Sequence, residues 1–279
     1  MYQMTREERF ANTLRATLDY VLRDMTHPQG GFYSAEDADS LPDDSSTHKE
    51  EGAFYVWTAD EWEEVLGPEL GALAGYFYGV LPGGNAPPQG DPHGELRGKN
   101  ILYLARDADE VSRRVQMPIE EIAQKIGEAR AKLLERRNTR PRPHRDEKII
   151  ASWNGLMISA FARAAQILNE PRYAQAATRA LEFVENELWD SGTQKFRRHY
   201  KDGAAGFADD YAALARAALD VFETTFQTHS LDFAEALLGS LHHNFWDENG
   251  GGYFASQNDP HVLLRLKDDY DGAEPSANS

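Results

Sequence analysis

Four helical segments in the second half of the chain alternate between two hydrophobic patterns, and this alternation limits the possible folds most strongly. Segments 153–168 and 207–226 are apolar around almost their whole circumference, whereas segments 171–188 and 230–245 each carry one apolar stripe. A helix that is apolar on all sides is buried, and a helix with a single stripe lies at the surface. The pattern therefore predicts inner and outer helices in turn, packed as helical hairpins.

The loops after the outer helices repeat as well. Trp189 and Trp246 each follow an outer helix, and each precedes a turn and a short aromatic segment. Residues 25–33 have the same layout after a helix expected over residues 5–25. A recurring order of helix, turn and extended segment is typical of stacked helical hairpins. We therefore expect a mainly all-α fold with short β-hairpins in its loops.

The first half of the chain is less regular. Segments 59–67 and 68–80 predict two short helices broken at Gly67-Pro68, and residues 118–137 predict a further outer helix. We expect one domain over residues 1–279, in which residues 26–117 form a long loop insertion with a short β-hairpin and short helices.

The connections between helices are of two kinds. Inner-to-outer links are tiny, whereas outer-to-inner links are long and rich in Asp, Glu, His, Trp and Tyr. Antiparallel packing places all the long links at one end of the helices, and binding residues concentrate on loops carried by a rigid scaffold. The candidate site is therefore expected on the face formed by residues 26–58, 138–152, 189–206 and 246–274.

Composition excludes several classes of function. The chain has no cysteine, so disulfides, thiolate nucleophiles and CxxC redox chemistry are excluded. A net charge of −17 disfavours nucleic acid as a partner. The basic run at 130–148 fits the end of a helix, where cations complement the dipole.

Targeting signals and cofactor motifs are missing from the sequence. Its apolar runs are too short for a membrane helix of about 20 residues, and its first residues do not follow the signal-peptide pattern. We expect a cytoplasmic protein without a membrane partner. The sequence contains no HExxH zinc motif, EF-hand or phosphate loop, so we expect no metal and no cofactor.

Carboxylates and aromatic rings are mixed in the long loops, as they are in sugar sites. Several carboxylates around one pocket drive their pKa values apart, which supplies an acid and a base, and glycoside hydrolysis needs two of them. The candidate catalytic residues are Asp37, His144, Asp146, Asp210 and Asp271. The candidate substrate-binding residues are Tyr55, Trp57, Arg145, Trp153, Asn154, Tyr211 and Tyr270.

A simpler interpretation exists for some of these residues. Asp209 and Asp210 open a helix, where carboxylates cap free N–H groups and favour the positive end of the dipole. Asp37 lies in an acidic loop where carboxylates also serve solvation. The pair His242-His243 lies on an outer helix and is expected at the surface.

Five motifs together resemble the spermatogenesis-associated protein 20-like, thioredoxin-domain-containing family over nearly the whole chain: GGFYSAEDADS, EGAFYVW, RPHRDEKIIASWNGLMI, ADDYA and DGAEPSANS. The resemblance implies a partial (α/α)6 toroid similar to six-hairpin glycosidases and N-acylglucosamine 2-epimerases, without the family's thioredoxin-like domain. Relative to the family, the toroid would be truncated at both ends. A cut ring exposes inner-helix surface, so we expect association through that surface.

Three functions stay open. The first is a carbohydrate-active protein, most simply hydrolase-like, with Asp210 and either Asp146 or Asp37 as acid and base and a small carbohydrate as ligand. The second is a non-catalytic docking module for a partner protein. The third is a sugar epimerase or isomerase that uses His144, although the second histidine of epimerase relatives has no counterpart here.

Overall fold

The computed structural model describes the chain except for residues 88, 90, 202, 260, 268–274 and 279, and it divides into two compact units. Unit 1 comprises residues 1–35 and 146–279, and unit 2 comprises residues 36–145. Unit 2 is thus inserted into unit 1 in the sequence. Unit 2 overlaps the insertion expected over residues 26–117, but it begins at residue 36 and extends to residue 145.

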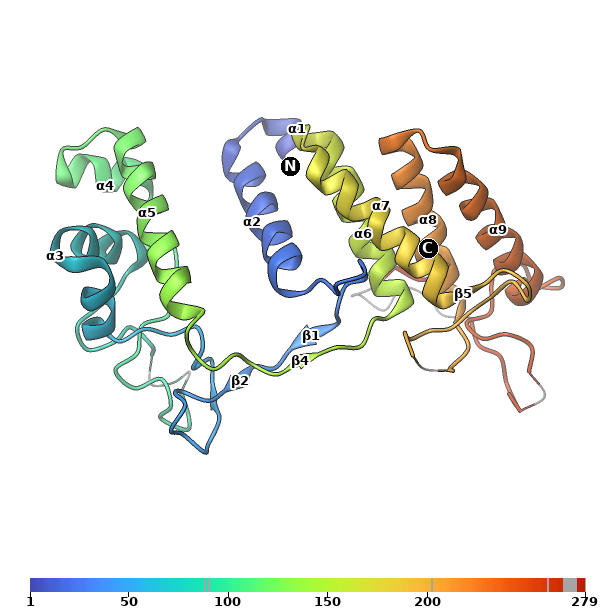
Figure 1. Ribbon diagram of the computed structural model, residues 1–279, viewed down its shortest axis with the longest axis horizontal. Helices are drawn as coiled ribbons and strands as arrows, with labels where there is room; N and C mark the ends of the chain where they lie inside the picture. The colour runs from blue at the N-terminus through green and yellow to red at the C-terminus, as the bar shows by residue number, and fades with distance from the viewer. Residues whose placement is uncertain (88, 90, 202, 260, 268–274, 279) are drawn as a thin grey trace. The chain divides into compact units, whose positions relative to one another are not determined.

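Unit 1 is built from helical hairpins (Figure 1). Helices α6 and α8 pack along each other, α7 packs on α6 and α8, and α9 packs on α8. These contacts confirm the mainly α fold and the alternation of inner and outer helices. The helices are α1 (Tyr2–Thr5), α2 (Glu8–Asp24), α6 (Ala151–Leu168), α7 (Pro171–Leu188), α8 (Ala208–Thr225) and α9 (Thr228–Phe245).

Tight turns join each inner helix to the next outer helix. Asn169 follows the last residue of α6 and Phe226 follows the last residue of α8, and both adopt the left-handed conformation, with φ of 55° and 57°. A left-handed residue at this position stops a helix and reverses the chain. Pro171 then begins α7, where its missing N–H costs nothing and its fixed φ suits the first turn.

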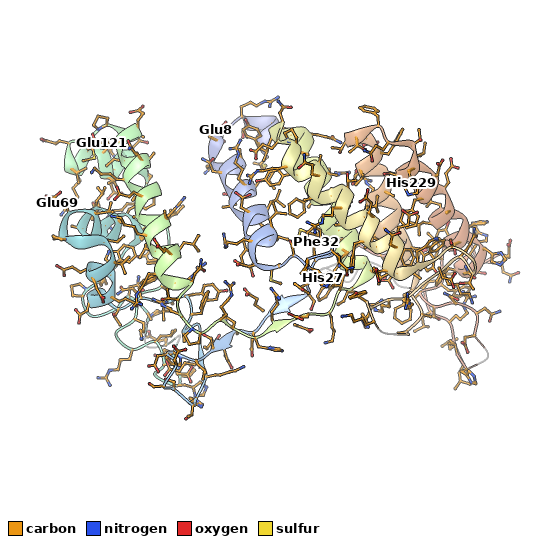
Figure 2. All side chains as sticks on the ribbon, in the orientation of Figure 1. Glu8, His27, Phe32, Glu69, Glu121 and His229 are labelled. Carbon is orange, nitrogen blue, oxygen red and sulfur yellow. The ribbon has the colours of Figure 1, made fainter. Side chains whose placement is uncertain are left out.

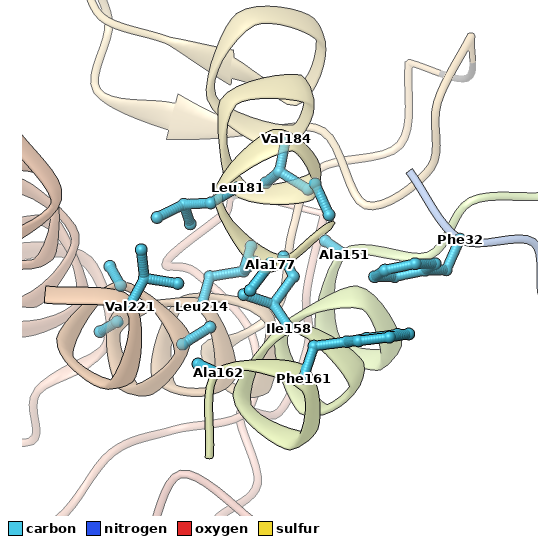
Figure 3. Packing of buried hydrophobic residues seen from close by; sticks show 14 of the residues in the cluster. Phe32, Ala151, Ile158, Phe161, Ala162, Ala177, Leu181, Val184, Leu214 and Val221 are labelled. Carbon is cyan, nitrogen blue, oxygen red and sulfur yellow. The ribbon is translucent and has the colours of Figure 1, made fainter. Parts of the chain in front are cut away.

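The core of unit 1 lies between these helices (Figure 3). Ile158 of α6 and Leu214 of α8 are fully buried together with Val184 of α7. Phe32, in the turn after α2 (Figure 2), stacks on Phe161 of α6 with ring centroids 5.2 Å apart. The turn after α2 is therefore part of the same core as the helical hairpins.

The turns after the outer helices contain short antiparallel pairings. β5 (Trp189–Asp190) pairs with β6 (Lys195–Phe196) after α7, and isolated bridges join Trp246 to Tyr253 after α9 and Thr26 to Phe32 after α2. The predicted short β-hairpins are confirmed by these pairings. β1 (Ala35–Glu36) and β4 (Arg145–Asp146) lie where the chain passes between the units.

Unit 2 has its own core of Trp57, Trp62 and neighbouring aliphatic residues. The break predicted at Gly67-Pro68 is confirmed, because Gly67 has φ of 73° and kinks α3. The Thr58 side chain caps α3 by accepting a hydrogen bond from the Glu61 N–H. The helices are α3 (Ala59–Tyr78), α4 (Ala108–Val115) and α5 (Ile119–Arg137), and β2 (Asp39–Ser40) pairs with β3 (Glu50–Glu51).

Among the described residues, none of the helices has the length and hydropathy that a membrane crossing requires.

Candidate functional site

Asp210 lies at the start of α8 and is fully buried. Its Oδ1 accepts a hydrogen bond from the Ser152 N–H of α6 at 2.9 Å, and its Oδ2 accepts one from the Phe207 N–H at 2.8 Å. The Arg198 guanidinium donates to Oδ2 at 3.2 Å. Asp210 therefore caps the N-termini of two inner helices at once, which is the interpretation that its position at a helix start suggested.

Asn154 and Tyr211 hold the turns that precede their helices. The Asn154 Oδ1 accepts a hydrogen bond from the Phe32 N–H at 2.7 Å, and its Nδ2 donates to the Phe32 carbonyl at 3.0 Å. The Tyr211 hydroxyl accepts a hydrogen bond from the Phe196 N–H at 2.9 Å. Asn154 and Tyr211 are both buried. Burial raises the pKa of Tyr211. Both side chains thus bind backbone in this structure.

A further copy of this contact involves Asn278, whose Oδ1 accepts a hydrogen bond from the Tyr253 N–H at 2.6 Å. Two of these contacts also share a spacing along the sequence, although Asn278 does not continue it. The separation of Asn154 from Tyr211 equals that of Phe196 from Tyr253. The turns and the inner helices therefore repeat as one structural unit.

Trp153 remains on the surface of α6, with 41% of its area exposed. It lines a cavity of about 370 Å³ between α6 and the turn after α2. The walls are mostly apolar or aromatic: Phe32, Tyr33, Ser34, Trp153, Asn154, Leu156, Met157 and Ala160.

Asp146 is linked to this cavity through its backbone. Its carbonyl accepts hydrogen bonds from both the N–H and the hydroxyl of Ser34. Its carboxylate pairs with Lys148 at 3.0 Å, and this hydrogen bond holds the pKa of Asp146 below its usual range. An ionised carboxylate accepts protons or hydrogen bonds, so Asp146 suits the role of a base or an acceptor rather than that of a general acid.

Asp37 and His144 lie in unit 2. The Asp37 N–H donates to the His144 carbonyl at 2.7 Å, and both side chains are exposed. The Asp37 carboxylate pairs with Lys49 at 3.0 Å, and this hydrogen bond lowers the pKa of Asp37. Backbone pairing thus brings the two residues to neighbouring positions in the fold.

Trp57 and Tyr55 occupy different environments in unit 2. Trp57 is buried, and the Arg140 guanidinium lies 4.1 Å from the centroid of its ring. The half-exposed Tyr55 donates its hydroxyl hydrogen to the Glu36 carboxylate at 3.2 Å, and burial raises the pKa of Tyr55. Arg145, the last residue of unit 2, is partly buried.

The predicted site residues therefore fall into separate groups. Unit 1 brings Asp146, Trp153, Asn154, Asp210 and Tyr211 to the N-terminal ends of its inner helices, and unit 2 holds Asp37, Tyr55, Trp57, His144 and Arg145. Tyr270 and Asp271 lie outside the described residues. Within the described part of the chain, no group of three or more metal-binding side chains is clustered.

Two further residues were not predicted from the sequence. Asp220 of α8 is buried and pairs with Arg163 of α6 and with Arg216, each at 3.2 Å. Arg130 of α5 lines a cavity in unit 2. The signals were present in the sequence, since Arg163 and Asp220 have the same separation as Asn154 and Tyr211, and Arg130 lies two helical turns before Arg137.

Comparisons with solved structures give low similarity. A D-mannose isomerase covers 94% of this chain and 61% of its own, at 12% identity and a TM-score of 0.35. A family 76 glycoside hydrolase from a bovine Bacteroides thetaiotaomicron strain covers 90% and 46%, at 11% identity and a TM-score of 0.38. A cellobiose 2-epimerase from Bacillus thermoamylovorans covers 87% and 58%, at 9% identity and a TM-score of 0.36. These values carry no inference about what this chain binds.

Comparisons of sequence give a different result. No family model matches the chain. Spermatogenesis-associated protein 20 is 37% identical in Homo sapiens and 35% identical in Rattus norvegicus, and in each case the match covers 100% of this chain. The chain spans 38% of the length of these relatives. Identity at this level along the whole chain shows that it belongs to the family of spermatogenesis-associated protein 20, as the motifs predicted.

Proposed function

We propose that unit 1 is a docking module that binds an α-helix of a partner protein along an exposed stripe of α6. One observation carries this proposal: the stripe is equivalent, in the repeat that relates α6 to α8, to a stripe of α8 that packs against α6. The exposed stripe consists of Trp153, Leu156, Ala160 and Arg163. Its equivalents on α8 are Asp210, Ala213, Ala217 and Asp220.

The stripe of α8 packs closely on α6. A methyl group added at Gly155 would lie 2.6 Å from the Ala213 carbonyl carbon, so the two helices touch through their backbones at this point. Asp210 caps the α6 N-terminus, and Asp220 pairs with Arg163 further along α6. The contact between α6 and α8 therefore extends from the first turn of α6 to Arg163.

The same geometry describes the helix that would bind the exposed stripe of α6. Leu156 occupies the position on α6 that Ala213 occupies on α8, and 41% of Leu156 is exposed. On α6, the residue that packs against Ala213 is a glycine, Gly155. A partner that meets the bulkier Leu156 and Trp153 must also present small residues, because larger ones would hold the backbones apart. The occupant is thus an amphipathic helix with a glycine and alanine stripe.

A hydrocarbon-stapled peptide of residues 149–168, labelled with a fluorophore, presents such a stripe and serves as the probe. Circular dichroism first establishes that the stapled peptide is helical. We expect saturable binding by fluorescence anisotropy, weakened at least about tenfold by Leu156→Arg in the protein. The control Leu238→Arg changes a similarly exposed leucine on α9 and leaves binding unchanged.

A second variant tests the geometry from the side of the peptide. Gly155→Leu in the peptide should prevent the close approach and abolish binding to the unmodified protein. Two results would refute the docking proposal: the unmodified peptide binds Leu156→Arg protein as tightly as it binds unmodified protein, or it binds neither protein.

Carbohydrate binding is the second candidate, and it depends on the cavity beside Trp153. The exposed Trp153 ring offers a stacking surface, and the ionised Asp146 lies beside Ser34 of the cavity wall as an acceptor. A sugar that binds only the folded chain raises its Tm with dose. Melts against mono-, di- and uronic-acid-containing sugars, in the parent and in Trp153→Ala, test this function. A shift that survives Trp153→Ala would place any sugar elsewhere.

A further inference from the structure

A cavity of about 400 Å³ lies within unit 2, between α5, the end of α3 and two loop segments. Tyr55–Trp57 forms one segment and Ile101–Leu102 the other, and they are joined through the paired backbones of Trp57 and Asn100. A volume of this size accommodates a small organic molecule.

The walls of the cavity are apolar and rich in rings. Trp57 and Tyr78 are buried side chains that form its interior, and Leu133 of α5 is buried beside them. Tyr55 and Ile101 are both well exposed and lie at the edge. Aromatic surfaces on several sides favour a flat aromatic ligand, because ring pairs attract beyond the area that they bury.

The charge of the cavity is positive although the chain carries a net charge of −17. Arg130 and Arg137 lie on the same face of α5, two turns apart, and the lining contains no Asp or Glu. The Glu36 carboxylate, which accepts the Tyr55 hydroxyl hydrogen, pairs with Arg142 at 3.3 Å. Its negative charge is therefore compensated.

Arg130 is the cation best placed to receive an anion. Its Nε donates to the Tyr78 hydroxyl, which fixes the guanidinium at the wall. Among the described residues, the ion pairs of α5 involve Lys132 and Arg136 but not Arg130. The terminal nitrogens of a guanidinium bind a carboxylate with two parallel hydrogen bonds.

We infer that this cavity binds a small aromatic carboxylate, with its ring against the apolar lining and its carboxylate on Arg130. The site lies in unit 2 and does not depend on the docking proposed for unit 1. The ligand class follows from ring-lined walls combined with a fixed guanidinium.

Isothermal titration of the full chain with naphthalene-2-acetate tests the inference, with the neutral 2-naphthaleneethanol as the matched ligand. We expect the carboxylate to bind at least about tenfold more tightly than the alcohol, since hydrogen bonds to charged groups exceed neutral ones by that order. Arg130→Gln should remove this preference, and Arg130→Lys should retain part of it. Arg113→Gln, which removes an exposed arginine of α4, is the control for lost charge.

Thermal melts of each variant separate a loss of binding from a loss of fold. Three outcomes would overturn the inference: no heat with millimolar carboxylate, equal affinity for carboxylate and alcohol, or an equal loss in Arg113→Gln and Arg130→Gln. A preference for the carboxylate that disappears only in Arg130→Gln supports it.

Discussion

The substitution Asp210→Asn separates a structural role for this carboxylate from the catalytic role that the sequence suggested. An amide keeps one oxygen, so it can accept from only one of the two N–H groups, those of Ser152 and Phe207, that Asp210 now binds at 2.9 and 2.8 Å. The other N–H then faces an NH₂ group in a fully buried site. Losing a hydrogen bond to a charged group costs about 1.5 to 3 kcal/mol. We expect the free energy of opening of unit 1 to fall by that amount.

Hydrogen exchange followed by mass spectrometry is the suitable assay because the chain divides into two compact units. Peptides from the first turn of α6 should lose protection, whereas peptides from unit 2 provide an internal reference in the same sample. Asp232→Asn on α9 removes a surface carboxylate and should change protection by less than about 0.5 kcal/mol. Unchanged protection at Ser152 in Asp210→Asn would refute the capping role.

Two further predictions follow from the same structure. Gly155→Ala places a methyl group 2.6 Å from the Ala213 carbonyl carbon and should lower the free energy of unfolding by about 1 to 3 kcal/mol. In contrast, the methyl group of Gly239→Ala on α9 meets nothing within 4 Å, and this variant should raise the free energy of unfolding by about 0.5 to 1 kcal/mol. Equal effects of the two variants in chemical unfolding would contradict the close approach of α6 and α8. The Lys267 ammonium lowers the pKa of Asp247 to about 2. Because the folded pKa lies below the ordinary value near 4, the stabilisation is complete above about pH 4 and is lost as the pH falls through 2. An NMR titration of Asp247 should therefore show the low pKa, and Lys267→Met should return it toward 4.

The helices of unit 1 were predictable because their hydrophobic pattern depends on local spacing. The segments expected at 171–188 and 230–245 agree with α7 (Pro171–Leu188) and α9 (Thr228–Phe245) to within two residues at each end. The break at Gly67-Pro68 was also predictable, since a proline after glycine interrupts a helix whatever surrounds it.

The roles of the site residues were harder to predict, because they depend on which partner each polar atom finds. Asn154 and Tyr211 combine amide, ring and hydroxyl groups that suit sugar recognition, yet in the structure both bind the backbone of a preceding turn. Their separation, which Arg163 and Asp220 share, was visible in the sequence and indicates a repeated structural contact.

The inserted unit has a consequence for how this chain can change. Within unit 1, the Ser34 N–H lies 3.3 Å from the Asp146 carbonyl, and within unit 2, the Asp37 N–H lies 2.7 Å from the His144 carbonyl. The points where the chain leaves and re-enters the helical hairpins are thus neighbours. A segment whose two ends are neighbours can be removed or replaced with little change to the rest of the fold, because the loop left behind spans only a few residues. Unit 2 therefore meets the geometric condition for an insertion into the helical hairpins.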